Sequence, residues 1–262
     1  MPEGHLNGMT SPSEPSILAA GEGSPVECLN PQGTAGVVLV CEHASPFIPA
    51  GLTDLGLSEA DRWSHAVWDP GAMEVARAMS AALDAPLVAA RVSRLVYDCN
   101  RPPEAEGAMP ARTETVEVPG NRDLTPEARA LRVREVYEPF RRTLAEVLAD
   151  RPNAALVTVH SFTPVWFGTP RSAEIGLLHD ADDRLARAML GKSSILPSGV
   201  ALNVPYSAAD GVTHTLREHG QGRQSVMIEI RNDLIADTAA AHEMGGALAA
   251  VCIASIAPEG AA

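Results

Sequence analysis

The stretch "AALVTVHS", residues 154–161, is the part of the sequence that indicates the fold most clearly. Its apolar and β-branched side chains follow one another without interruption, which is typical of a strand covered on both faces. The run ends abruptly at His160 and Ser161. A histidine at a strand end is often only structural, but it can also be a metal ligand held at the edge of a sheet. The rest of the sequence helps to decide between these interpretations.

Other apolar runs, such as "VVLVC" at 37–41 and "VMIEI" at 226–230, alternate along the chain with helical patterns. The clearest helical patterns cover residues 69–85 and 125–151, and both have a proline near the start, as first helical turns often do. This alternation predicts an α/β fold, a three-layer α/β/α sandwich on a mostly parallel or mixed sheet. In such sheets, ligands bind outside the carboxyl ends of the strands.

The sequence also suggests where the domain begins. Residues 1–34 are rich in Gly, Pro and Ser and show no hydrophobic periodicity, so we expect a disordered or loosely attached tail. Residues 35–262 are then expected to form a single domain. Within it, residues 103–123 are polar and interrupted by Pro and Gly, which predicts a long loop of the kind that often carries function.

Composition excludes several classes of partner. The net charge is −13, which argues against binding to a nucleic-acid backbone or to an anionic membrane. No stretch has the length and hydropathy of a membrane span, and no secretory signal is visible. The four cysteines are far apart and form no CxxC pair, so we expect neither a disulfide framework nor a cysteine zinc site. A cytoplasmic location fits this pattern.

Ionisable or polar side chains follow four of the apolar runs. Because the carboxyl ends of parallel strands meet at one edge of a sheet, four such placements together predict a functional site there. The groups are Glu42 and His43 after "VVLVC", Asp98, Asn100 and Arg101 after "SRLVY", His160 and Ser161 after "ALVTV", and Glu229 and Arg231 within "VMIEIR".

The two histidines of this group suggest a metal site. A catalytic zinc ion usually has three protein ligands and one open position, and His43 and His160 can provide two of them. The third ligand is then expected to be a carboxylate, for which Glu42, Asp69 and Glu229 are candidates. The ordinary alternative for Asp69 is that it caps the helix that follows it.

Glu229 stands between large apolar residues, where a glutamate is costly unless it is paired or its pKa rises. A carboxylate beside a metal-bound water is the usual general base for hydrolysis. The alternative is an ion pair with Arg231, which lies on the same face of the strand. Among Arg94, Arg101 and Arg231, one could bind a substrate carboxylate and another could polarise a scissile carbonyl.

Several motifs resemble those of the N-formylglutamate amidohydrolase (N-formylglutamate deformylase) family, in the branch with an E/D-H-A-S motif. The resemblance extends from about residue 36 to about residue 257, and the motifs occur in the family's order. They are "CEHASPFIP", "WDPGA", "SRLVYDCNRPP", "PGNRDLTPEAR", "YEPF", "VTVHSFTP", "PYSAADGVTHTLREHG" and "IEIRNDLI".

The family is similar to carboxypeptidases of the zinc-exopeptidase type, and this wider resemblance implies roles for particular residues. Carboxypeptidases have a His-Ser ligand motif, an Asn-Arg pair that binds the substrate carboxylate, and a Glu-Leu-Arg stretch that carries the base. The matching positions here are His160-Ser161, Asn100-Arg101 and Glu229-Ile230-Arg231. The implied cofactor is Zn²⁺ or another divalent metal.

The resemblance also bears on the third ligand. Carboxypeptidases open their metal site with H-x-x-E, but Pro46 stands at the glutamate position after His43 and cannot bind a metal. The motif "WDPGA" recurs in this branch, so the resemblance favours Asp69 as the ligand that joins His43 and His160. Glu42 is the second choice.

The implied reaction is hydrolysis of an N-formyl or other N-acyl amino acid, such as N-formylglutamate, by a metal-dependent hydrolase. The substrate is a small molecule, and no nucleic acid or membrane is expected as a partner. His219 could act as an acid, and Tyr206 and Ser207 are further candidates for the site. The expected catalytic residues are Glu229, Arg231 and Arg94, and the expected substrate-binding residues are Asn100, Arg101, His214 and Arg217.

Two other functions compete with this interpretation. The first is a zinc carboxypeptidase-like peptidase, whose pocket would have to admit a peptide past the 103–123 loop. The second is a protein that binds amino-acid derivatives without turnover. The combination of His43, His160 and Glu229 argues against the second, because a binder has no need of a base beside the metal.

Overall fold

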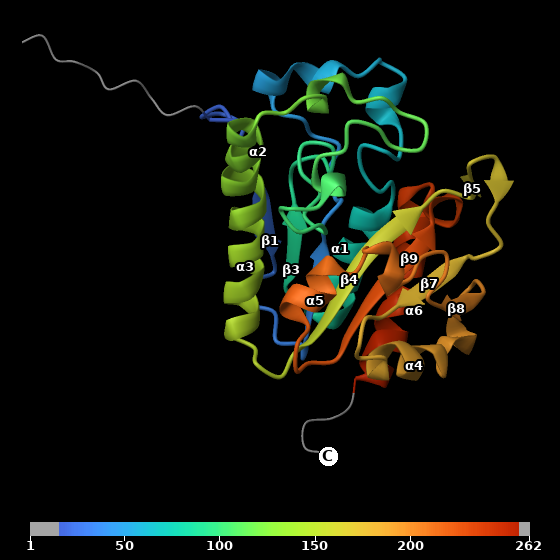
Figure 1. Cartoon of the computed structure of the whole chain (residues 1–262). Helices are drawn as coiled ribbons and strands as arrows, with labels where there is room; N and C mark the ends of the chain where they lie inside the picture. The colour runs from blue at the N-terminus through green and yellow to red at the C-terminus, as the bar shows by residue number, and fades with distance from the viewer. Residues whose placement is uncertain (1–15, 257–262) are drawn as a thin grey trace, which may run out of the picture.

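The computed structural model describes residues 16–256, which are built on a seven-stranded sheet (Figure 1). The strands are β1 (Val26–Leu29), β2 (Val37–Cys41), β3 (Leu87–Ala90), β4 (Ala155–Phe162), β7 (Ile175–Leu178), β8 (Val200–Leu202) and β9 (Ser225–Arg231). Their order across the sheet is β1-β3-β2-β4-β9-β7-β8. The pairs β1–β3 and β7–β9 are antiparallel and the others are parallel, so the predicted mixed, mostly parallel sheet is confirmed. A separate hairpin consists of β5 (Val165–Trp166) and β6 (Thr169–Pro170).

Helices cover both faces of the sheet, which gives the predicted three layers. One core contains buried side chains of α1 (Ala72–Leu83), α4 (Arg184–Leu190) and α6 (Thr238–Ser255). The core on the other face contains those of α3 (Glu138–Ala149) and α5 (His214–His219). The predicted long helix is present as α2 (Pro126–Arg132) and α3, joined by a π-helical turn over Val133–Tyr137. Short 3₁₀ turns cover Ala50–Gly56, Asp61–Trp63, Glu106–Ala108, Pro119–Asn121, Ser193–Ile195, Ala208–Asp210 and Asn232–Ile235.

Strand β2 shows why the apolar runs are continuous rather than alternating. Successive side chains of a strand point to opposite faces of the sheet. Val37, Leu39 and Cys41 therefore belong to the core beneath α1 and α6, whereas Val38 and Val40 belong to the core beneath α3. All five side chains are buried. Both faces of a central strand need apolar residues, so the polar positions are left for the strand ends.

The first described residues differ from the prediction. Val26–Leu29 pairs antiparallel with Leu87–Ala90 at the edge of the sheet, and the buried Ile17 donates its backbone N–H to Glu135. The prediction of a loosely attached tail is therefore wrong for residues 16–34. Residues 1–15 lie outside the described part of the chain. A four-residue edge strand with half-buried side chains has too little periodicity to be recognised from sequence.

The stretch "SRLVY" also differs from the prediction. Its apolar run indicated a strand that ends at the sheet edge, but in the structure it forms turns. The Ser93 hydroxyl donates to the carbonyl of Val67 and accepts the backbone N–H of Leu95, which folds the chain into turns. Leu95, Val96 and their neighbours are buried under the α3 side of the sheet, and for this reason they look like a strand in the sequence. Asp98, Asn100 and Arg101 thus reach the site from buried turns rather than from a strand end.

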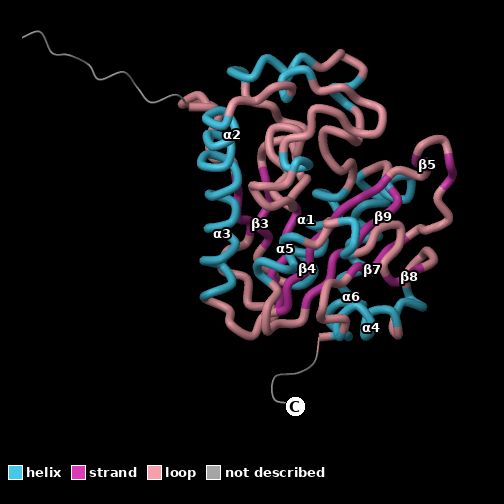
Figure 2. The backbone as a smooth tube through the Cα atoms, in the orientation of Figure 1, coloured by secondary structure: helices cyan, strands magenta, loops and turns pink. Residues whose placement is uncertain are grey.

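Loops gather at one end of the sheet, at the top of the view in Figure 2. The segment that follows β2 contacts the predicted 103–123 loop, which contains only short turns and an isolated bridge. No helix among residues 16–256 is long and apolar enough to cross a membrane.

Candidate active site

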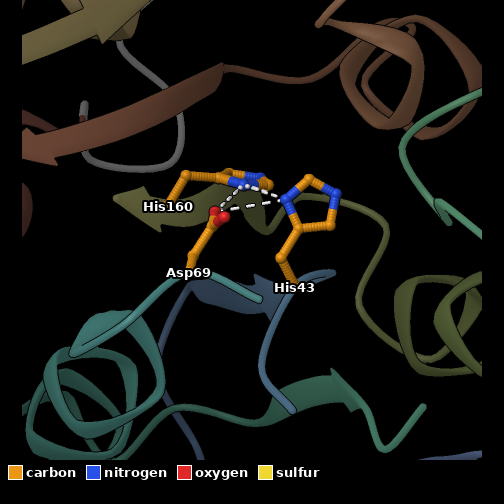
Figure 3. Close-up of side chains that lie close together, drawn as sticks. All are labelled: His43, Asp69 and His160. Carbon is orange, nitrogen blue, oxygen red and sulfur yellow. Dashed lines mark hydrogen bonds and ion pairs between the residues drawn. The ribbon is translucent and has the colours of Figure 1, made fainter. Parts of the chain in front are cut away.

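His43, Asp69 and His160 meet at the carboxyl ends of β2 and β4 (Figure 3). The Asp69 Oδ2 atom lies 3.1 Å from His43 Nδ1 and 2.9 Å from His160 Nδ1. The two Nδ1 atoms are 3.1 Å apart, and all three side chains are buried. Sequence elements far apart in the chain thus bring three donor atoms to one point.

A second pair of carboxylates contacts the outer nitrogen of each histidine. His43 Nε2 lies 2.7 Å from Asp98 Oδ1, and His160 Nε2 lies 3.0 Å from Glu42 Oε2. A carboxylate at Nε2 favours the tautomer with the proton on that nitrogen, which leaves the lone pair on Nδ1. In that tautomer both Nδ1 lone pairs would face the Asp69 carboxylate. Glu42 supports His160 from the far side of the ring and is not one of the three converging donors.

This donor set fits a cation. Two bare lone pairs and a carboxylate oxygen within about 3 Å of one another repel unless a positive charge lies between them. Burial lowers the pKa of His160, but the Glu42 and Asp69 carboxylates outweigh burial and raise this pKa well above its ordinary value. The site therefore attracts a proton, and the same electrostatics allow these residues to hold a metal ion.

Asp69 does not cap helix α1, so this alternative from the sequence is wrong. The N-cap position is Gly71, and a Cβ there would lie 2.6 Å from the carbonyl oxygen of Ile235. The tight turn at Gly71, with φ of 80°, leaves the Asp69 carboxylate facing the histidines. Its Oδ1 accepts from Arg94 at 3.1 Å and its Oδ2 accepts the backbone N–H of Ser161 at 3.3 Å.

Glu229 lies beside this cluster on β9, directly opposite His160 in the register of β4 and β9. Its side chain is buried, and Oε2 has no hydrogen-bond partner among the described residues. Burial raises the pKa of Glu229 to about 7. The alternative considered from the sequence, an ion pair with Arg231, is not formed. Arg231 instead contacts Asp233 at 2.8 Å and Glu174 at 3.6 Å.

One cavity of about 130 Å³ contains these groups. Among the residues predicted from the sequence, the three candidate metal ligands and the candidate base Glu229 line this cavity. Asn100 and Arg101 from the "DCNRP" motif line it as well. Arg94 and Tyr206 also line it. The lining includes His43, Asp69, Arg94, Asn100, Arg101, His160, Tyr206 and Glu229.

Asn100 and Arg101 differ in how free they are to bind a ligand. The Asn100 amide donates to the carbonyl of Val212 at 2.5 Å and accepts the backbone N–H of Thr215 at 3.0 Å. It therefore holds the turn before α5 against the cavity. The Arg101 guanidinium donates to the Gly211 carbonyl, and no ion pair links it to a described carboxylate. Arg101 is thus available to an anionic ligand.

Other predicted residues lie elsewhere or have other partners. Arg94 lines the cavity, but its terminal nitrogens bind the Asp69 and Asp98 carboxylates, so it orients the groups around His43. His214 binds the Tyr137 hydroxyl at 2.8 Å, and Arg217 pairs with Asp180 at 3.1 Å. Neither of these two lines the cavity, because α5 packs on the face of the sheet. Three further residues that the sequence suggested for the site also lie outside the cavity: Arg231, His219 and Ser207.

The cavity wall also contains residues that sequence reasoning missed. His65, Glu114 and Trp166 line it, and none of them follows a predicted strand that would have drawn attention to it. His65 stands four residues before Asp69, and Trp166 stands six after His160. Nearness in sequence to a candidate ligand is the one signal that could have found these two residues.

The three-layer fold holds three buried metal-type donors and an unpartnered carboxyl group at the strand ends, an arrangement suited to hydrolysis. A family model described as N-formylglutamate amidohydrolase matches residues 35–236. The chain belongs to the N-formylglutamate amidohydrolase family, as its motifs predicted. No curated protein matches the sequence.

Two solved structures are similar to this chain. A gene product of Agrobacterium tumefaciens is 46% identical, with a TM-score of 0.89 over 91% of this chain and 97% of that one. The N-formylglutamate amidohydrolase of Ralstonia eutropha is 20% identical, with a TM-score of 0.63 over 88% of this chain and 97% of that one. The second likeness supports the fold alone.

Proposed function

We propose that this chain is a metal-dependent amidohydrolase that removes the N-formyl, or another N-acyl, group from an amino acid such as N-formylglutamate. The observation that carries the proposal is the position of Glu229. A buried carboxyl group with an unpartnered oxygen shares one cavity with three converging metal-type donors. Membership of the amidohydrolase family supports the same reaction.

His43, Asp69 and His160 are the proposed ligands, and their two imidazoles and one carboxylate match the donors of a catalytic Zn²⁺ site. When bound, such an ion acts as a Lewis acid on the amide carbonyl and lowers the pKa of a water molecule. Asp98 and Glu42 keep both histidines in the tautomer that presents Nδ1.

Glu229 is the proposed proton carrier. A carboxylate oxygen of Glu229 accepts a proton from the attacking water. Glu229 then delivers that proton to the amide nitrogen as the C–N bond breaks. The products are formate, or another carboxylate, and the free amino acid. A buried carboxyl group beside the attacking water is suited to both transfers.

Arg101 is the proposed partner of the substrate's α-carboxylate, and Asn100 positions the turn beside it. The cavity, about 130 Å³, is smaller than the roughly 300–1,000 Å³ of many ligand pockets. The space beside the reacting groups therefore suits a small acyl group such as formyl. The non-catalytic alternative leaves the unpartnered Glu229 without a use.

A cytoplasmic location remains part of the proposal. The four cysteines are all free, and three of them are buried, which suits a reducing compartment. The acidic net charge of −13 gives no reason to expect nucleic acid as a partner.

The proposal is tested by formate release from a panel of N-formyl amino acids with zinc-loaded protein. We expect release that depends on the metal and disappears on chelation. Peptide hydrolysis without formate release would favour the carboxypeptidase-like function. Binding of the panel without turnover of any member would favour the non-catalytic one.

A further inference from the structure

A second, open pocket of about 680 Å³ adjoins the catalytic cavity. The two share Arg101, Trp166, Tyr206 and Val212, so the outer pocket begins where the proposed site for the α-carboxylate ends. The outer pocket adds Arg171, which follows the β5–β6 hairpin.

Aromatic rings surround the Arg171 guanidinium. Its central carbon lies 4.7 Å from the ring centre of Tyr206, 4.8 Å from that of Trp166 and 5.3 Å from that of Phe162. Cation–π contacts of this kind orient a guanidinium but do not neutralise it. The Arg171 side chain also hydrogen-bonds the Tyr206 hydroxyl and donates to the carbonyl of Thr163 at 3.5 Å. Within residues 16–256, no ion pair links Arg171 to a carboxylate.

The backbone of Arg171 is also fixed. Its N–H donates to the Pro164 carbonyl at 2.8 Å, across the base of the β5–β6 hairpin. Its carbonyl accepts from Arg231 at 3.5 Å, and Arg231 is itself held by Asp233. The charge is therefore placed in advance at the pocket wall, which reduces the entropy lost when an anion binds.

Two acidic residues near the pocket contact backbone or hydroxyl groups rather than the two arginines. Asp210 lines the outer pocket, but its Oδ2 accepts from the backbone N–H and the hydroxyl of Ser207. Glu114, on the wall of the inner cavity, accepts the backbone N–H of Phe167. In a chain of net charge −13, two guanidinium groups, Arg101 and Arg171, face one pocket without a carboxylate partner.

We propose that Arg171 is a specificity-determining residue that binds a second anionic group of the substrate, remote from the scissile amide, while Arg101 binds the α-carboxylate. The inference rests on the proposed function and adds to it the residue that separates acidic from neutral substrates. The ring faces of Trp166 and Tyr206 would contact the aliphatic part of the same side chain.

The test compares N-formylglutamate with N-formylglutamine, which has nearly the same shape but lacks the second charge. Arg171→Met should lower kcat/KM for N-formylglutamate by about 10- to 100-fold, mainly through KM, because a charged hydrogen bond is lost. The value for N-formylglutamine should change by less than about threefold. Arg171→Lys should recover part of the loss, because it keeps the charge without the planar fork.

The matched control is Arg91→Met, since Arg91 donates to the Ser24 carbonyl and lies outside both pockets. It should leave both substrates unaffected. An equal loss on both substrates in Arg171→Met would overturn the proposal and assign Arg171 a purely structural role in the hairpin. An unchanged ratio between the substrates would overturn it as well.

A binding measurement separates this proposal from the proposed reaction. Calorimetric titration with L-glutamate and L-glutamine requires no turnover. We expect Arg171→Met to weaken glutamate binding by at least about tenfold and to leave glutamine binding unchanged. If the wild type hydrolyses neither substrate but this difference appears, the proposed reaction fails and the anion site stands. If the difference is absent, the anion site fails whatever the reaction.

Discussion

Replacement of Glu229 by glutamine removes the proton-carrying carboxyl group but nearly preserves the size of the side chain. Glu229→Gln should reduce kcat by about 10²- to 10⁴-fold while the metal content stays at the wild-type level. Steady-state kinetics and elemental analysis of one preparation check both statements. The matched control is Glu174→Gln, which removes a carboxylate outside the cavity. Activity within about threefold of wild type in Glu229→Gln would remove this residue from the mechanism.

The choice of third ligand can be tested at two carboxylates that contact the same histidine. Asp69 faces the Nδ1 atoms, whereas Glu42 lies at His160 Nε2. Asp69→Asn should abolish stoichiometric metal binding. Glu42→Gln should weaken it by only about 10- to 100-fold, as expected for a group that supports a ligand. Competition with a chelating indicator measures the metal affinity of both variants. A larger loss of metal affinity in Glu42→Gln than in Asp69→Asn would make Glu42 the ligand.

For single residues, sequence reasoning succeeds where the course of the backbone alone decides the position. His43 and Glu42 follow β2, and His160 lies near the end of β4, so their meeting follows from parallel strands. Side-chain partners are a different matter. Arg231 and Arg217 look equally free in the sequence, yet each finds a carboxylate that lies distant in the chain, at Glu174 and Asp180.

Helix α6 offers a test at the scale of elements, because it contains two adjacent glycines with different surroundings. A Cβ on Gly245 would lie 2.6 Å from the Ala78 side chain and 2.8 Å from the Val75 carbonyl on α1. A Cβ on Gly246 would meet nothing within 4 Å. Gly245 therefore permits the close approach of α6 to α1.

Gly245→Ala should lower the free energy of unfolding by about 1–3 kcal/mol, because it forces the two helices apart. Gly246→Ala should raise the free energy of unfolding by up to about 1 kcal/mol through helix propensity. Urea denaturation of the two variants measures both changes. Equal effects of the same sign would show that the α1–α6 contact does not depend on Gly245.

The elements themselves are predictable to different degrees. Central strands such as β2 and β9 are buried on both faces, and their continuous apolar runs identify them. Edge strand β1 is half-buried and has no such run. The segment 93–97 is apolar because it is buried, but Ser93 turns the backbone, so burial and strand formation cannot be told apart there.

Acid stability is a property of the whole molecule to which one partly buried histidine should contribute. Burial lowers the pKa of His219 to about 4, below the roughly 6.5 of an unfolded histidine. The folded state therefore binds fewer protons in this range. The stability that this histidine contributes is present above pH 6.5 and is lost as the pH falls toward 4.

Comparison with His219→Gln isolates this contribution. Between pH 6.5 and 4, the wild type should lose about 1–3 kcal/mol more unfolding free energy than the variant. Chemical denaturation at a series of pH values in this range measures the difference. Parallel curves for the two proteins would mean that His219 does not titrate differently on unfolding.

If His43, Asp69 and His160 form a metal site in the folded protein, the metal content of the purified chain should depend on them. Elemental mass spectrometry on wild type and His160→Ala, purified in the same way and reconstituted with zinc, compares the two. We predict about one zinc ion per wild-type chain and almost none in the variant, with unchanged circular dichroism. A wild type without metal after reconstitution, or a variant that keeps its full complement, would contradict the account.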